Sequence, residues 1–330
     1  MPQRLKPKRI AVVGDFSLDY CRYNLAHYLS KEEPCVVAHP LNETKAFGGA
    51  GNTANNVHSL GGVVIPITII GEDEAGDLMI EIFKKNGVDT SGIIQLKERK
   101  THVYEKIYAS ASGSHGQHNQ IIRIDTKPQG DLTKEQTNIL IEKIKEKINE
   151  IDAIVVADYS KGIVTKELIQ FISTLDKIKV GDSRPKLNEF NNFTVLAPNE
   201  FEAYSALHGT DYVSGEDISN EMVKEIGIKL KERLNLKYLV ITRGSKGMVA
   251  FDDSKGYIID AVVTDAVDVT GAGDTVAAAI ALGLVSGLSL LDTAKIANYA
   301  GGVVVRKKGT ATCTVEEIIK LKERIKDQKN

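Results

Sequence analysis

A glycine-rich loop near the C-terminal end of the sequence leads into an apolar run and ends in an aspartate. Residues 268–274 read Asp-Val-Thr-Gly-Ala-Gly-Asp, and the run 275–282 has high helix propensity. The first N–H groups of a helix lack partners within it, and glycines let a ligand approach them. Together with the helix dipole, these groups could stabilise charge on a transferring phosphoryl group. We therefore predict that Gly271, Ala272 and Gly273 bind that group and that Asp274 accepts the proton of an attacking hydroxyl.

Two aspartates follow the first apolar strand of the chain. The strand covers residues 10–13, and Asp15 and Asp19 come directly after it. Open α/β sheets bind their ligands at this end of their strands. Both carboxylates could accept hydrogen bonds from the neighbouring hydroxyls of a sugar. A strand-end aspartate that only shapes a turn is the alternative interpretation.

A second glycine cluster, Gly-Gly-Ala-Gly-Asn at residues 48–52, allows two interpretations. Gly49, Gly51 and Ala54 fit the dinucleotide fingerprint, with Glu72 at a suitable distance, so a nicotinamide oxidoreductase is a rival hypothesis. That fingerprint should follow a buried strand, whereas residues 41–47 are mostly polar. In the preferred interpretation, Gly48 and Gly49 let the backbone approach a sugar, and the Asn52 amide offers a donor and an acceptor to its hydroxyls.

Strand-like and helix-like segments alternate along most of the chain, which predicts an α/β fold with a mostly parallel central sheet flanked by helices. Thr133 and Gln136 form a capping box ahead of an amphipathic helix. Residues 20–47 and 99–125 break the alternation and predict a small β lid. The expected strands are 10–13, 63–70, 153–157, 179–181, 194–197, 238–242, 248–251 and 257–259, and the expected helices include 50–60, 76–86 and two closing helices from about Ala272 and Leu290.

Composition excludes several classes of protein. The 330 residues are 42% hydrophobic and 26% charged, as in an ordinary soluble protein, and we expect one domain over residues 1–330. A formal net charge of −2 argues against a protein that binds nucleic acid mainly through phosphate contacts. Apolar runs are too short for a signal peptide core or a membrane span, and the three cysteines lack metal-ligand spacing. We expect a cytoplasmic protein that binds neither membranes nor nucleic acid.

The loop at residues 268–274 resembles the signature of the ribokinase-like (PfkB) carbohydrate kinases, and further motifs match that family in the same order from residue 9 to about residue 314. The resemblance implies an ATP-dependent sugar kinase with a ribokinase-like fold, whose β lid covers the sugar and makes a homodimer contact. A non-catalytic sugar-binding regulator is disfavoured because Asp274, Glu202 and the glycine loop are all present. The sequence lacks the His-x-Gly-His motif of a nucleotidyltransferase, so we expect the kinase activity alone.

The same resemblance implies the nucleotide site. Asn199 and Glu202 match the family's Asn-x-x-Glu motif, in which the acid organises Mg²⁺ on the nucleotide phosphates, often through water; a plain helix N-cap is the alternative. Residues 308–310 resemble the place where relatives use a K⁺ ion. The residues implied to contact ATP are Asn199, Glu202, Thr242, Gly244, Ser245, Gly247 and Asn298.

Two blocks resemble one group within the family, the heptose 7-phosphate kinases that serve ADP-heptose synthesis. These are Asp-Tyr-x-Lys-Gly at 158–162 and Gln-x-x-Arg-x-Asp at 120–125. Arg123 and Lys161 could bind a substrate phosphate, with Asp158 beside the sugar. Residues 181–186 read Gly-Asp-Ser-Arg-Pro-Lys, where the group usually has Asp-Pro-Lys, and this departure leaves the exact substrate open. The expected reaction is phosphorylation of a heptose 7-phosphate at the anomeric hydroxyl, with fructose, ribose or fructose phosphate as alternative substrates.

Overall fold

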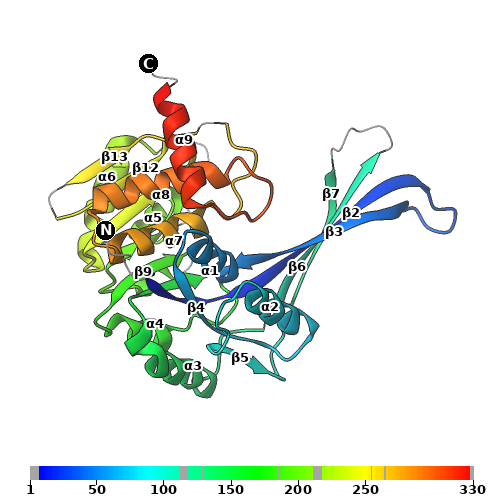
Figure 1. Cartoon of the computed structure of the whole chain (residues 1–330), viewed down its shortest axis with the longest axis horizontal. Coiled ribbons are helices and arrows are strands. Elements are labelled where there is room, and N and C mark those ends of the chain that lie inside the picture. Colours follow the sequence, from blue (N-terminus) through cyan, green and yellow to red (C-terminus); the bar gives the residue numbers. More distant parts are fainter. Residues whose placement is uncertain are drawn as a thin grey trace, which may run out of the picture.

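The computed structural model describes residues 7–111, 118–127, 129–184, 186–210, 218–253, 255–263 and 265–327. Within them, a nine-stranded sheet forms the body, in the order β13-β12-β11-β10-β9-β8-β1-β4-β5 (Figure 1). Pairing is parallel except at β12 and β13, which are antiparallel. The strands are β1 (Arg9–Gly14), β4 (Val63–Gly71), β5 (Ile93–Leu96), β8 (Ala153–Asp158), β9 (Ile178–Ser183), β10 (Val195–Leu196), β11 (Tyr238–Thr242), β12 (Met248–Phe251) and β13 (Gly256–Ile259).

Helices cover both faces of this sheet and enclose two apolar cores. The helices are α1 (Ala50–Ser59), α2 (Glu74–Lys85), α3 (Lys134–Lys147), α4 (Lys166–Ser173), α5 (Glu200–His208), α6 (Asn220–Arg233), α7 (Ala272–Val285), α8 (Leu290–Val304) and α9 (Val315–Asp327). Because side chains alternate along a strand, Ile10 and Val12 of β1 enter one core and Ala11 and Val13 the other. Helices α1, α2, α7, α8 and α9 pack on the first core, and α3 to α6 on the second.

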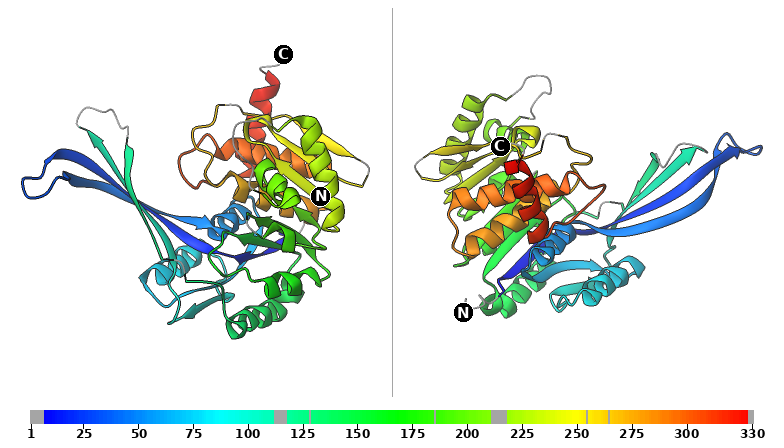
Figure 2. Two further views of the ribbon diagram at one scale, coloured as in Figure 1. Left: turned by 180° about the vertical axis from the view of Figure 1, so that it is seen from behind. Right: turned by 45° about the horizontal axis from the view of Figure 1, so that its top comes forward.

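A separate four-stranded sheet, the lid, extends from the body as a long arm (Figure 2). Its strands are β2 (Phe16–Leu29), β3 (Val36–Gly49), β6 (His102–Ala111) and β7 (Asn119–Asp125), in the order β3-β2-β6-β7. Strand β2 begins directly after β1, and β3 ends where α1 begins, so the lid strands reach beyond the predicted segment 20–47 at both ends. The predicted lid residues 112–117 lie outside the described part of the chain.

Most predicted elements are present, with ends displaced by a few residues. Thr133 and Gln136 form the predicted capping box at the start of α3. The two expected closing helices are present as α7, which begins at Ala272, and α8, which begins at Leu290; the helix α9 that follows them was not predicted. The short strand β5 and the helices α4, α5 and α6 were not predicted. Helix α4 is only eight residues long. Helix α5 begins in the Asn199–Glu202 motif, for which a nucleotide site is the preferred prediction and a helix N-cap the alternative.

No helix among the described residues is both long enough and apolar enough to cross a membrane.

Candidate active site

Asp274 lies in the first turn of α7, and its carboxylate accepts hydrogen bonds from three side chains. Gly271, in the left-handed conformation with φ 79°, stands at the N-cap of this helix. Asn52 of α1 donates its Nδ2 to Asp274 Oδ2 at 2.6 Å. Thr53 donates its hydroxyl to Oδ1 at 3.1 Å, and the Tyr159 hydroxyl donates to the same oxygen. Tertiary folding therefore joins α7, α1 and the loop after β8 at one carboxylate.

Burial controls the acidity of this carboxylate. Asp274 is 3% exposed, and desolvation raises its pKa to about 6, although the hydrogen bonds from Tyr159, Asn52 and Thr53 and the charge of Arg184 act in the opposite direction. At neutral pH most of the population is ionised, and the basicity is well above that of an ordinary aspartate. A base of this kind is suited to accepting a hydroxyl proton.

The backbone at Gly271 approaches Asn52 too closely for any other residue. A Cβ atom at this position would lie 2.5 Å from Asn52 Nδ2, and the φ of 79° is itself unfavourable for an L-residue. Gly273, in the first turn of α7, is open apart from Asp182 Oδ2 at 3.8 Å. The two glycines thus bring the start of α7 against Asn52 and leave its N–H groups accessible from the other side.

The carboxylates of Asp15 and Asp158 hold the loop after β8. Asp15 is 1% exposed and accepts the backbone N–H groups of Tyr159, Lys161 and Ile163 at 2.7 to 3.0 Å. Asp158 accepts from the Ser183 hydroxyl at 2.8 Å, and burial together with the nearby charge of Asp15 raises the pKa of Asp158 to about 6. Both were predicted to bind sugar, and this stays a prediction. In the structure, Asp15 positions the segment that carries Tyr159 and Lys161, and Asp158 accepts the Ser160 N–H of the same segment at 3.0 Å.

Asp19 lies in the lid strand β2. It is 5% exposed and forms an ion pair with Lys106 of β6, with Nζ 2.9 Å from Oδ2. A Cβ atom at Gly48 would lie 3.1 Å from Asp19 Oδ1 and 2.7 Å from Ser17 Oγ, so Gly48 leaves room for both side chains. Ser17 Oγ and His102 Nε2 are buried without a hydrogen-bond partner among the described residues, and the two residues are neighbours across β2 and β6.

The two predicted phosphate ligands meet at one aromatic ring. The Arg123 guanidinium lies 4.4 Å from the centre of the Tyr104 ring, and the Lys161 ammonium lies 5.2 Å from it. Arg123 also makes a two-pronged contact with Asp125 at 2.6 and 2.9 Å. Lys106 pairs with Arg123 in the register between β6 and β7. Three cationic side chains that are distant in sequence therefore gather at the base of the lid.

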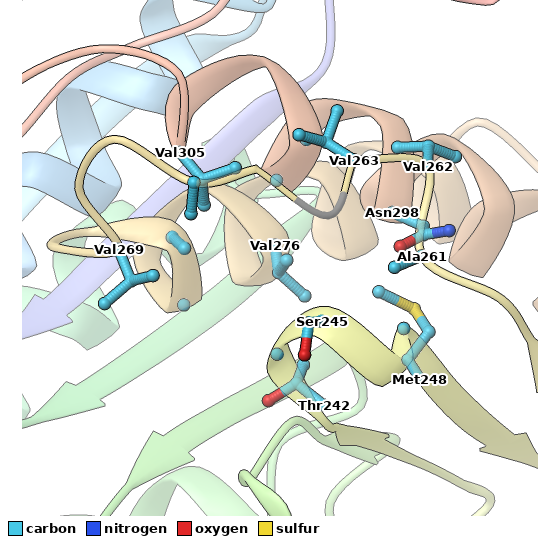
Figure 3. A pocket seen from close by; sticks show the side chains of 17 residues that line it. Thr242, Ser245, Met248, Ala261, Val262, Val263, Val269, Val276, Asn298 and Val305 are labelled. Carbon is cyan, nitrogen blue, oxygen red and sulfur yellow. The ribbon is translucent and has the colours of Figure 1, made fainter. Parts of the chain in front are cut away.

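Five of the seven residues predicted to contact the nucleotide line one cavity of about 170 Å³. Figure 3 shows Thr242, Ser245 and Met248 on one side of it and Val276, Val305 and Asn298 on the other. Asn298 donates its amide to the Asp260 carbonyl at 2.7 Å. The predicted residues in the lining are Thr242, Gly244, Ser245, Gly247, Ala272, Gly273 and Asn298; most of the other lining residues are apolar.

Asn199 and Glu202 form a capping box at the start of α5, next to this cavity but not in its lining. Asn199 Oδ1 accepts the N–H groups of Phe201 and Glu202, and Glu202 Oε2 accepts that of Asn199 at 2.8 Å. Glu202 Oε1 faces Arg184 at 3.5 Å. Burial and the charges of Glu202 and Asp274 hold the pKa of Asp182 well above its ordinary range. The three carboxylates therefore act on one another electrostatically.

This side of the site has the oxygen chemistry that Mg²⁺ requires, but few ligands. Glu202 and Asp182 offer carboxylate oxygens, which suit a hard cation. Among the described residues, no group of three or more histidine, cysteine, aspartate or glutamate side chains is arranged to hold a metal ion. The donor set fits an ion that keeps waters and enters with nucleotide phosphates.

The segment 308–310 is tied to the loop that precedes α7. Asp268 Oδ2 accepts the N–H of Gly309 at 2.9 Å, and Asp268 Oδ1 accepts that of Thr270 at the same distance. Thr310 Oγ1 is buried without a partner among the described residues. The predicted K⁺ segment and the loop before Asp274 therefore lie side by side.

Sequence reasoning did not assign Thr53, Tyr159, Asp182, Arg184 or Lys106, all of which the structure places at the site. Tyr159 lies within the Asp-Tyr-x-Lys-Gly motif, of which only Asp158 and Lys161 were predicted to bind substrate. Lys106 stands in a predicted lid strand, where alternation alone could not show which face meets the body. The segment Gly49–Ala54 follows a lid strand and not a strand of the central sheet, which removes the structural basis of the dinucleotide interpretation.

Comparison with known proteins gives one family. Residues 7–317 match the model of the pfkB family carbohydrate kinases. The bifunctional protein HldE of Sulfurimonas denitrificans is 34% identical over 317 residues; the match covers 94% of this chain and 63% of that protein. Phosphofructokinase-2 from Escherichia coli in complex with potassium superposes with a TM-score of 0.74 at 17% identity, covering 98% of this chain and 100% of that one. Ribokinase from Arabidopsis thaliana, complexed with ribose and ATP, gives 0.69 at 19% identity, covering 96% and 99%.

Proposed function

Because the chain belongs to the pfkB family of carbohydrate kinases, we propose that it transfers the γ-phosphoryl group of ATP to the anomeric hydroxyl of a heptose 7-phosphate. The family match and the ribokinase-like fold establish a carbohydrate kinase with a phosphotransferase activity. The substrate and the residue roles below are our proposal.

In this proposal, the sugar lies between the lid and the start of α7. Asn52, Asp19, Gly48 and Gly49 contact its hydroxyls, and the attacking hydroxyl gives its proton to Asp274. The N–H groups of residues 271–274 stabilise charge on the transferring phosphoryl group, and holding both groups in line lowers the entropic part of the barrier.

ATP occupies the cavity beside α7 and α8, with its phosphates toward Gly273. Glu202 would organise a Mg²⁺ ion bound with these phosphates, and the ion would offset their charge. A K⁺ ion near residues 308–310 would act through Asp268 on the same loop; the solved phosphofructokinase-2 in complex with potassium makes this worth testing. These ions are part of the proposal.

The observation that carries the choice of a phosphorylated sugar is the pair of cations on the Tyr104 ring. The chain has a formal net charge of −2, so preference for an anion must arise from local charge. Arg123 and Lys161 supply it, with Lys106 alongside. Arg123 and Lys161 lie in the two blocks that resemble the heptose 7-phosphate kinases.

The test compares kcat/KM for heptose 7-phosphate, fructose 6-phosphate, fructose and ribose. A charge-assisted hydrogen bond contributes about 1.5–3 kcal/mol, or about one to two decades of affinity. The double variant Arg123→Ala/Lys161→Ala should lose that much toward the phosphorylated sugar and little toward the others. If an unphosphorylated sugar is the best substrate, or the double variant keeps its preference, the heptose assignment fails.

Arg22 provides a matched control. It also lies in the lid, stacks on a tyrosine (Tyr20, 4.7 Å) and pairs with an acid (Glu105, 2.9 Å), and its exposure of 49% is close to the 45% of Arg123. Cys21 is in register with Lys106 and, through it, with Arg123. Because side chains alternate along a strand, Arg22 lies on the face of the lid opposite to Arg123. Arg22→Ala should leave the substrate preference unchanged.

We also propose that the lid pairs with the lid of a second copy. Val36, Ile121 and Ile122 are at least half exposed, and β3 and β7 are edge strands whose backbone groups could pair further. Ile122→Glu should shift a dimer toward monomer in light scattering at micromolar concentration. Ile139→Glu, on an exposed position of α3, is the control that should not. A monomeric parent protein would refute this proposal.

A further inference from the structure

Among the described residues, three side chains donate to Asp274, which leaves one acceptor position for the substrate, on Oδ2. A carboxylate offers about four acceptor positions, two on each oxygen. Thr53 and Tyr159 occupy both positions of Oδ1, whereas Asn52 occupies only one of Oδ2. A Cβ atom at Gly271 would lie 3.5 Å from Oδ2, so this oxygen faces the glycine loop. The free position is therefore on the oxygen that lies beside the glycine loop.

Tyr159 is held firmly in its place on the other oxygen. Its backbone N–H donates to Asp15 at 2.7 Å, and its ring lies so close to Gly49 that a Cβ there would be 3.3 Å from Cδ2. Arg184 lies 5.9 Å from the centre of the ring. Burial and the charge of Asp274 keep the pKa of Tyr159 well above its ordinary range, so the phenol remains protonated and acts as a donor.

We infer that Tyr159 is a positioning residue for the proposed base: its hydroxyl occupies Oδ1, turns the free acceptor position of Oδ2 toward the sugar and favours the ionised carboxylate. The inference rests on the proposed role of Asp274 and adds a residue to it. A hydrogen bond to an ionised carboxylate favours that form, so the Tyr159 contact acts against the burial that raises the pKa of Asp274.

Tyr159→Phe removes the hydroxyl and keeps the ring against Gly49. The pKa of Asp274 should then rise above its present value of about 6, by about one unit for the loss of one hydrogen bond to a charged group. Because the base acts in its ionised form, the acidic limb of kcat/KM should move to higher pH by the same amount. The KM for ATP should not change.

Other charges also face Asp274 and must be kept constant. The charge of Arg184 favours the ionised form of Asp274, whereas the charges of Asp274 and Asp182 of β9 repel each other. Glu202 and Asp158 in turn raise the pKa of Asp182. None of them is altered by Tyr159→Phe. Tyr257→Phe is the matched control, because Tyr257 donates to the Asp252 carboxylate at 2.9 Å in the β12–β13 hairpin.

The pKa of Asp274 is best measured by NMR in the free protein, with aspartate isotopically labelled at the carboxyl carbon. The Asp274 signal is identified by its absence from the spectrum of Asp274→Asn. This NMR measurement requires no substrate. A higher midpoint in Tyr159→Phe and an unchanged one in Tyr257→Phe support the inference. An unchanged midpoint in Tyr159→Phe overturns it, even if the protein is less stable, since a purely structural role would alter stability and not the titration. A shifted midpoint in a protein that phosphorylates no sugar would instead overturn the proposed function.

Discussion

The proposed nucleotide cavity and the proposed sugar site are built from different kinds of side chain. The cavity is lined mainly by glycine and by apolar groups such as Val276, Val305 and Met248. On the sugar side, Asp19 pairs with Lys106, Arg123 with Asp125, and Asp274 with three donors. An empty apolar cavity carries no unpaired charge, whereas a buried charge without a partner is costly. The sugar side therefore satisfies its own charges, and a substrate must exchange partners with them.

The strongest test of this difference removes the base while leaving the cavity unchanged. Asp274→Asn should lower kcat by roughly 10²–10⁴, the usual contribution of a positioned general base. ATP binding, measured by calorimetry, should remain close to that of the parent protein, because Asp274 does not line the cavity. Turnover within about a factor of three of the parent value would remove Asp274 from the mechanism.

The second test moves Asn52 without changing a charge. Gly271→Ala and Gly287→Ala place the same side chain on glycines with φ of 79° and 81°, so both should lose about 1–2 kcal/mol of unfolding free energy. Only at Gly271 would the new Cβ meet Asn52 Nδ2, at 2.5 Å; at Gly287 nothing lies within 4 Å.

The pair separates backbone strain from damage to the site. Because Asn52 binds the Oδ2 oxygen of Asp274, Gly271→Ala should lower kcat/KM by at least about tenfold, the effect of losing one hydrogen bond to a charged group. Gly287→Ala should keep its activity. Equal activities in the two variants would contradict the close approach of Gly271 to Asn52.

The smallest effect is expected at Glu202, beside the proposed nucleotide cavity. Glu202→Gln keeps an oxygen for the Asn199 N–H but removes the charge, so the Mg²⁺ concentration for half-maximal rate should rise several-fold. The KM for sugar should be unaffected. Glu189→Gln, at a partly exposed acid of the short 3-10 helix before β10 that pairs with Lys166 at the surface, is a control for general charge effects. An unchanged Mg²⁺ titration would exclude Glu202 from metal organisation.

The sequence alone determined the fold class and the local features of the site. Apolar runs such as residues 10–13, the capping box at Thr133 and the loop at residues 268–274 are local signals, in which neighbouring residues create the pattern. They predicted the parallel sheet, the start of α7 and the family. The Asn199–Glu202 motif shows the limit of such signals, because one pattern encodes a helix cap in the structure and a nucleotide contact in the proposal.

The tertiary structure alone decided which side chains share a partner. Tyr159 reaches Asp274 across 115 positions of sequence, and Lys106 reaches Asp19 across 87. It also decided that Asp15, predicted as a sugar ligand, accepts three N–H groups of the loop after β8. The physical reason is that alternation in a strand defines two faces without saying which is buried. The packing of α1, β8 and β9 against α7 removes water from Asp274, and that burial raises its pKa.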